Sequence, residues 1–396
     1  MSRKTNYVIR LICYIIVILC ITISCKALLN CYEGKDSHPY IMCLIFFIAK
    51  AMCTLVNFFT NKPEEIEEII PIKDLVPNQS TTEITIPKMD YSNNNDYTST
   101  EHCNVKIIKN PMVYYILLFP SVIDVINVTF SIYAMNLVNS SVYQYITMFQ
   151  TANQYMICYR NKNGKFPKQG ILGYLICLIC VVALLIYYLA SGQYRSSVGL
   201  VFLLITHIVN AFLFIINDAY ILNKYEINSV KLNGIEGAFS ALIYVLLLIC
   251  MINIKCVYTS SSFKNYICNN NSYMEEVSTF FASNRNDNGI KYFYMVLFFA
   301  GVWIYYSIDD SMRQNEYTTT TIFCIKDIIC YVIVWLVFNL IHFERIVPSR
   351  SFEFMNIPEI VIGLLIFIGL LINNSVFEIK YLKEENIDLI ISNEDK

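Results

Sequence analysis

The sequence is poor in charged residues, and this shortage sets the class of protein. Only 15% of its 396 residues are charged and 56% are hydrophobic, which gives a mean hydropathy of +0.48. An ordinary soluble protein with a single core does not contain so much apolar chain, so we expect a protein that resides in a bilayer. The formal net charge of −2 and the lack of a long Lys/Arg block argue against a nucleic-acid partner.

Catalytic and metal-binding signatures are also missing. No Gly-rich loop ends in Lys-Ser or Lys-Thr, so the sequence has no visible means of pumping with ATP. The four histidines are dispersed, and none forms a zinc-like pair with another His or with a Cys. No Gly-x-Ser-x-Gly elbow supplies a nucleophile. We therefore expect neither an enzyme nor a bound metal or cofactor.

The 15 cysteines lie mostly inside apolar segments, where a free Cys behaves as a small hydrophobe. They indicate neither a disulfide framework nor a metal site. Cys25 with Cys31 and Cys256 with Cys268 lie in or beside loops that we expect on the same non-cytoplasmic side. A disulfide in either pair stays an open alternative.

Apolar runs of about 20 residues predict an all-α polytopic membrane protein with ten transmembrane helices. The polar, Asn-rich segment 61–109 predicts disorder. The densest basic loop, 160–168, predicts by the positive-inside rule that this loop, the 61–109 loop and both termini are cytoplasmic. The expected spans are 7–28, 38–60, 112–136, 139–160, 170–190, 198–221, 235–254, 290–308, 318–343 and 357–377.

The order of features along the chain is repeated. The fourth and fifth spans show a polar Ser/Thr start, a charged loop with proline and a span that contains glycine, and the ninth and tenth spans show the same order. We therefore divide the chain into two five-helix repeats, 1–195 and 196–396. Because five is odd, the second repeat enters the membrane from the opposite side, so the repeats are inverted.

Polar side chains follow single faces of several spans. In the fourth span, Ser140, Gln144, Thr147 and Thr151 recur at spacings of three and four, which places them on one helical face. Such a stripe faces either a neighbouring helix or a water-filled cavity, and both interpretations stay open. Further candidates for substrate binding on one face of a span are Asp124 and Asn127, His207 and Asn210, and Thr320 and Asp327.

Charges within spans cost about 2.5 to 3.5 kcal/mol each at the bilayer centre, so they tend to be buried and functional. Asp124 and Asp327 are the expected sites of substrate binding or proton coupling, and a structural hydrogen bond is the alternative for Asp124. Lys50 either snorkels toward the membrane surface or pairs with Asp124 or Asp218. His207 is either a core histidine or a proton acceptor.

Four passages resemble the drug/metabolite transporter superfamily, and within it the solute carrier 35 branch, subgroup F. These are His38-Pro39, the segment 120–124 from Pro to Asp, the Ser-Ser-Val-Tyr-Gln run at 140–144, and the Asn-Gly-Ile-Glu-Gly run at 233–237. The resemblance extends over nearly all of the chain outside 61–109. It implies ten helices in two inverted halves, a central cavity lined by the third, fourth, eighth and ninth helices among others, and alternating access.

The sequence also departs from that branch. Ile146-Thr147-Met148 stands where the family carries Leu-Arg-Gly, Lys50 stands where it often carries Glu, and Phe323 and Cys330 stand where it often carries Arg. Asp124 and Asp327 match acidic positions. The loss of fixed positive charge disfavours an anionic nucleotide-sugar as the substrate and favours a neutral or cationic metabolite or drug-like compound.

The sequence thus predicts a secondary transporter for a small organic solute, driven by proton coupling or by exchange. A nucleotide-sugar transporter and a non-transporting scaffold or receptor-like membrane protein are the alternatives, and a role like that of the chloroquine-resistance transporter is a neighbouring possibility. The expected partners are the solute and the lipid bilayer, with the chain as a monomer or homodimer. The family implies an endomembrane location such as Golgi, lysosome or vacuole.

Overall fold

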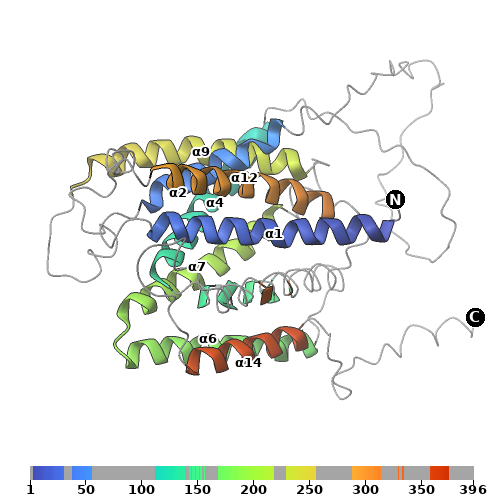
Figure 1. Ribbon diagram of the computed structural model, residues 1–396, viewed down its shortest axis with the longest axis vertical. Coiled ribbons are helices and arrows are strands. Elements are labelled where there is room, and N and C mark those ends of the chain that lie inside the picture. Colours follow the sequence, from blue (N-terminus) through green and yellow to red (C-terminus); the bar gives the residue numbers. More distant parts are fainter. Residues whose placement is uncertain are drawn as a thin grey trace, which may run out of the picture.

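The computed structural model describes residues 3–30, 38–55, 112–138, 168–217, 229–255, 288–313 and 357–373, with short pieces between 142 and 156 and between 329 and 333. Every long element within these residues is an α-helix (Figure 1). The helices are α1 (Arg3–Asn30), α2 (Pro39–Ala51), α4 (Met112–Leu137), α6 (Lys168–Ala190), α7 (Tyr194–Ile215), α9 (Ser229–Asn253), α12 (Asn288–Arg313) and α14 (Ile357–Asn373).

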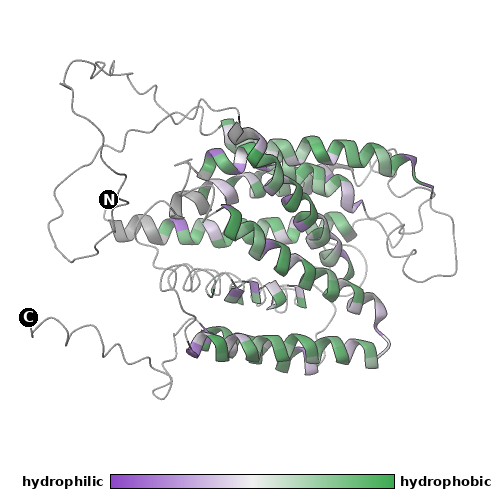
Figure 2. Ribbon diagram, turned by 180° about the vertical axis from the view of Figure 1, so that it is seen from behind, coloured by the Kyte–Doolittle hydropathy of each residue, from purple (hydrophilic) through white to green (hydrophobic). Residues whose placement is uncertain are grey.

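Six of these helices, α1, α4, α6, α7, α9 and α12, are long and apolar enough to cross a membrane, and α2 and α14 are shorter apolar helices. Hydrophobic residues cover the helices (Figure 2). Ile179, Leu242, Leu246 and Val296 are 63 to 67% exposed. Helices in water would carry polar residues on such faces, whereas lipid favours apolar ones. The described residues therefore fit an integral, multi-pass, helical membrane protein.

The helices follow the predicted spans closely where the structure describes them. α4 begins at residue 112, as the sequence predicts, and the start of α6 at Lys168 is close to the predicted 170. Among the helix starts α9 differs most, because it begins at Ser229 and not at 235, and α2 ends at Ala51 and not at 60. The span 318–343, most of 139–160 and the whole 61–109 segment lie outside the described residues. The count of ten spans therefore stays a prediction.

Hydroxyl groups within the helices are mostly satisfied by the helices themselves. Six of them donate to the carbonyl four residues earlier, at 2.6 to 2.9 Å. A bilayer supplies no water for these donors, so the backbone is the nearest partner available. The six are Thr22, Ser121, Thr129, Thr147, Thr206 and Ser307.

The helices pack as pairs: α1 with α12, α2 with α9, α4 with α7, and α6 with α14. The last pair is antiparallel, because Gln169 near the start of α6 donates to the carbonyl of Ile372, while Tyr188 near its end donates to Glu359. α4 also contacts α9, and α2 contacts α12. Figure 1 shows α1, α2, α4, α9 and α12 in one group, with α6 and α14 at the opposite edge.

Each helix pair has a glycine where the two backbones come close. A Cβ atom on Gly237 of α9 would lie 2.5 Å from the backbone nitrogen of Ala51, and one on Gly234 would lie 2.5 Å from that of Thr54. α2 and α9 are thus antiparallel and in backbone contact. The glycines that fill this role in the other pairs are Gly301 against α1, Gly199 against α4, and Gly173 and Gly369 between α6 and α14.

The contact between α2 and α9 gives a first prediction. Gly237→Ala places a methyl group against the α2 backbone, which cannot rotate away, so we expect a loss of about 1 to 3 kcal/mol in the free energy of unfolding. Gly289→Ala in α12 is the matched control, because nothing lies within 4 Å of its Cβ position. Thermal unfolding of the purified protein in detergent compares the two. Equal midpoints would show that the close approach is absent.

Candidate functional site

Three charged residues from three helices meet inside the bundle. The Lys50 Nζ atom of α2 lies 2.7 Å from Asp124 Oδ2 of α4 and 3.1 Å from Glu236 Oε2 of α9. The side chains of Lys50, Asp124 and Glu236 are 3%, 2% and 0% exposed. We call these three residues the charge cluster. An ammonium that donates to two carboxylates in a dry interior makes strong, charge-assisted hydrogen bonds.

The close contact of α2 with α9 explains why Glu236 reaches Lys50. Glu236 is next to Gly237, whose missing side chain lets the Lys50 backbone approach α9. On the α4 side, the Ser240 hydroxyl donates to the Ser121 carbonyl at 3.2 Å, and Ser121 lies less than one turn before Asp124. Small residues therefore draw all three helices together at the level of the charges.

The surroundings of the charge cluster are aromatic and apolar. The Lys50 Nζ atom lies 5.1 Å from the centroid of the Tyr306 ring of α12, a cation–π distance. Tyr306 in turn packs edge-on against Phe46, with ring centroids 5.9 Å apart. Water is excluded from the ammonium on this side. Among the described residues, the carboxylates that balance its charge are those of the cluster itself.

The charge cluster is not electrically neutral. One ammonium faces two carboxylates, so the three ionised side chains sum to a single negative charge. Only one Glu236 oxygen is paired with Lys50, and Oε1 has no hydrogen-bond partner among the described residues. A buried charge without compensation costs several kcal/mol. The excess negative charge of the cluster is therefore either used in the function of the protein or neutralised by a further cation.

The sequence left open whether Lys50 snorkels or pairs with Asp124 or Asp218, and the structure brings Lys50 and Asp124 together. It places the other described candidates elsewhere. Asn127 lies one turn after Asp124, and its buried Oδ1 atom has no partner among the described residues. The Thr147 hydroxyl is used by its own helix, at 2.6 Å from the Tyr143 carbonyl.

The polar face of α4 continues beyond the charge cluster. The Ser131 hydroxyl lies 2.6 Å from the hydroxyl of Tyr143, which belongs to the predicted fourth span. Asn127 lies between Asp124 and Ser131 along this face. The stripe that the spacing predicts on α4 therefore joins the charge cluster to the fourth span.

His207 is buried in α7, and Asn210 is half-buried one turn later. The His207 ring packs edge-on against Phe149 at a centroid distance of 5.9 Å. Within the described part of the chain, its ring nitrogens make no hydrogen bond of normal geometry, although the Ile146 backbone interacts with the ring. Packing and proton acceptance both remain available to it. Ser140, Gln144, Thr151, Asp218, Thr320 and Asp327 lie outside the described residues.

Sequence reasoning missed Glu236 as a site residue. The predicted span began at residue 235, which put Glu236 at the membrane edge, where a carboxylate needs no explanation. The helix begins at Ser229, so Glu236 lies about two turns inside it and within the candidate span Val230–Asn253. The Gly-Ile-Glu-Gly run was the available signal, because glycines beside a charge indicate close helix packing.

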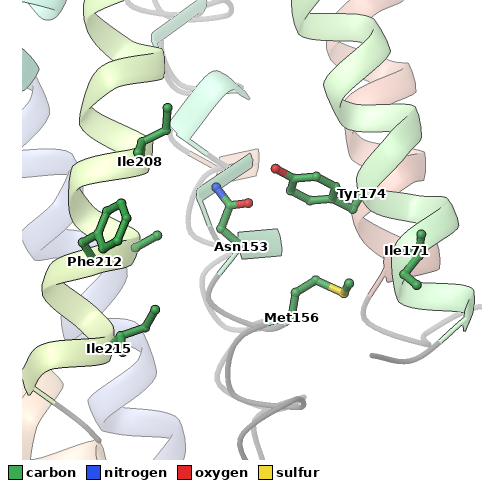
Figure 3. A pocket seen from close by; sticks show the side chains of 8 residues that line it. Asn153, Met156, Ile171, Tyr174, Ile208, Phe212 and Ile215 are labelled. Carbon is green, nitrogen blue, oxygen red and sulfur yellow. The ribbon is translucent and has the colours of Figure 1, made fainter. Parts of the chain in front are cut away.

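A separate cavity of about 440 Å³ opens between the predicted fourth span, α6 and α7 (Figure 3). Asn153 and Tyr174 point toward one another across it, and the rest of the lining is apolar. Neither residue was predicted as a site residue. The lining consists of Asn153, Met156, Ile171, Tyr174, Ile208, Ala211, Phe212 and Ile215.

Cys25 is a buried free thiol in α1, whereas Cys31, Cys256 and Cys268 lie outside the described residues. No group of three or more His, Cys, Asp or Glu side chains within the described ranges is arranged to hold a metal ion.

Comparisons of the chain with family models, curated proteins and solved structures gave no match. The class of protein therefore rests on the helices and their surfaces, which fit an integral, multi-pass, helical membrane protein.

Removing the cation tests the charge cluster. Lys50→Met leaves two buried carboxylates unpaired, and we expect a loss of about 3 to 5 kcal/mol in the free energy of unfolding. Adding Asp124→Asn and Glu236→Gln to this variant removes the stranded charges, so stability should partly return. Lys255→Met, at an exposed position after α9, is the control. Thermal unfolding in detergent is the measurement, and equal stability of the two Lys→Met variants would contradict the ion pairs.

Proposed function

We propose that the chain is a secondary transporter that moves a small organic solute across an intracellular membrane by alternating access. The charge cluster carries this proposal. Its Lys50–Glu236 contact of 3.1 Å joins α2, from the first proposed repeat, to α9, from the second, and its Lys50–Asp124 contact of 2.7 Å adds α4 of the first repeat. A transporter of this kind rocks one repeat against the other around a central site. Charged contacts between the repeats can be exchanged for contacts with a solute or ion as that motion proceeds.

The pattern of helix pairs supports the inverted repeats. With the fourth and ninth spans counted, a shift by five spans converts α1, α2, α4 and α6 into α7, α9, α12 and α14. This shift turns the α1/α12 pair into the α7/α4 pair, and the α4/α9 contact into the α12/α2 contact. It leaves α2 paired with α9 and α6 paired with α14. A two-fold axis in the membrane plane predicts that these closest pairs are unchanged in this way, whereas the smaller α6/α7 and α1/α4 contacts have no counterpart of similar size among the described residues.

The net charge of the site indicates which class of solute it binds. A buried region with one excess negative charge repels anions and attracts cations, so a neutral or cationic metabolite or drug-like compound fits better than an anionic nucleotide-sugar. The predicted fourth span has no arginine before Arg160 at its end, and the predicted ninth span has none, which points the same way. We propose that the solute pathway runs along the polar faces that carry Asn127, Ser140, Gln144, Thr147, Thr151, His207, Asn210, Thr320 and Asp327.

A scaffold or receptor-like membrane protein is the second candidate, and one observation favours it. The hydroxyls of Thr147 and Thr206 donate to their own helices, and that of Ser240 donates to α4. Polar groups used in this way stabilise the helices and their packing, and they do not line a solute pathway. The two candidates differ in what the charge cluster does: in a scaffold it only has to be stable, and in a transporter it has to change partners.

The orientation and the membrane also belong to this proposal. We propose that both termini and the 61–109 loop are cytoplasmic, on the basis of the basic loop at 160–168. An endomembrane such as Golgi, lysosome or vacuole is proposed from the family resemblance. The chain acts as a monomer or homodimer, without a cofactor.

Transport in proteoliposomes tests the function. A screen for exchange of loaded metabolite mixtures, grouped by charge, identifies the solute, and we expect cationic or neutral compounds to exchange. Asp124→Asn should then lower uptake at least tenfold, because it removes a charge at the interface of the repeats. Lys255→Met is the control and should transport normally. Thermal unfolding of each variant separates a loss of transport from a loss of fold.

The same assay distinguishes the scaffold. If no class of solute exchanges with the wild-type protein, or if Asp124→Asn transports at the normal rate, the cluster is structural. A pH gradient imposed across the vesicles distinguishes proton coupling, which changes uptake, from exchange, which does not respond.

A further inference from the structure

We propose that Glu236 is the proton-binding residue of this protein and that Lys50 and Asp124 form the fixed ion pair beside it. The binding of the proton follows from the charge cluster alone. Its use to drive a solute rests on the proposed function. Sequence reasoning assigned coupling to Asp124 and Asp327, so this inference moves the proton to a different residue and helix.

The first step concerns charge. Among the described residues, the groups that interact with Glu236 are Lys50 from α2, Asp124 from α4, Tyr306 from α12 and the Asn217 side chain just after α7. Tyr306 and Asn217 are uncharged near neutral pH. The ionised cluster therefore carries one negative charge too many in a region that is at most 3% exposed. One added proton makes it neutral.

The second step locates the proton. Lys50 lies 2.7 Å from Asp124 and 3.1 Å from Glu236, so Asp124 holds the ammonium more closely. The Asn217 side chain interacts with the Glu236 carboxylate, yet the buried Glu236 Oε1 and Asn217 Oδ1 atoms make no hydrogen bond of normal geometry among the described residues. A proton on Glu236 Oε1 can donate to such an unpaired oxygen.

The third step distinguishes a proton from a metal ion. A metal ion needs several oxygen ligands around it, and the space between the two carboxylates already holds the Lys50 ammonium. Glu236 Oε1 is the one fully buried oxygen of the cluster that has no partner in the described part of the chain. A single free oxygen binds a proton well and a metal ion poorly.

Protonation then changes the cluster in a simple way. A hydronium ion from bulk water transfers its proton to Glu236, so one O–H bond of hydronium breaks, an O–H bond forms on Glu236 and a water molecule is released. The neutral acid holds the ammonium less strongly, so Lys50 remains with Asp124 and the link from α2 to α9 weakens. Loss of the proton to water restores it. Because α2 and α9 belong to different proposed repeats, this change acts on the contact between them.

Infrared difference spectroscopy of the purified protein in lipid nanodiscs tests the proton site without any solute. The carbonyl stretch of a buried carboxylic acid should be present in the wild-type protein and should fade as the pH is raised. Glu236→Gln should remove this signal. Glu359→Gln is the matched control, since Glu359 is another buried carboxyl group, in α14, and receives a hydrogen bond from Tyr188 at 2.9 Å. This control should retain the signal.

Two further variants test whether the infrared signal comes from a proton on Glu236. Asp124→Asn leaves one ammonium and one carboxylate, so the excess charge is gone and the signal should weaken at the same pH. Glu236→Asp keeps a titrating acid and should shift the band if Glu236→Gln proves too unstable to measure. A band that is unchanged in Glu236→Gln and in Glu236→Asp, or a wild-type protein without such a band at any pH at which it stays folded, overturns the proposal.

Transport under an imposed pH gradient is the second experiment, and it tests whether the proton on Glu236 drives the solute. Wild-type uptake should change with the gradient, whereas whatever uptake remains in Glu236→Gln should not respond to the gradient. If the infrared signal depends on Glu236 but no solute moves, the proposed function fails and the proton site stands. If solute moves but the infrared signal does not depend on Glu236, the transporter stands and the proton site fails.

Discussion

The ion pairs of Lys50 with Asp124 and Glu236 are the constraint on which the centre of the structure depends. A bilayer cannot solvate an ammonium or a carboxylate, so a helix that carries one must meet a helix that carries the other. This requirement fixes the rotation of α2, α4 and α9 about their own axes and their depth relative to one another. The glycines and serines around the charges allow the short distances.

The composition of the charge cluster separates stability from function. A structural bridge needs one carboxylate for one lysine, and Asp124 at 2.7 Å is sufficient for that purpose. Glu236 adds a negative charge that stability alone does not require and that the interior penalises. A second buried carboxylate is therefore the feature that any account of this protein has to explain, and reversible protonation explains it without another ligand.

The proposed inverted repeats give the cluster a further meaning. α2 and α9 are the helices that face one another across the proposed axis, and they carry opposite charges at their contact. Two identical charges related by the axis would repel, so the sequences of the two halves have to differ where they meet. This difference explains why the likeness between the halves is visible in the order of loops and polar segments and not in the residues that form the site.

The sequence by itself determined the class of protein and the extent of most helices, because the length of an apolar run and the cost of exposing backbone in lipid are local properties. It also indicated that Lys50 and Asp124 need partners. Only the tertiary structure decided which partners, since the contact of α2 with α9 joins residues 186 positions apart. Glu236 is a site residue because α9 begins at Ser229, and this start places Glu236 inside the bundle. Helix pairing is a property of two surfaces at once, and no single stretch of sequence contains both.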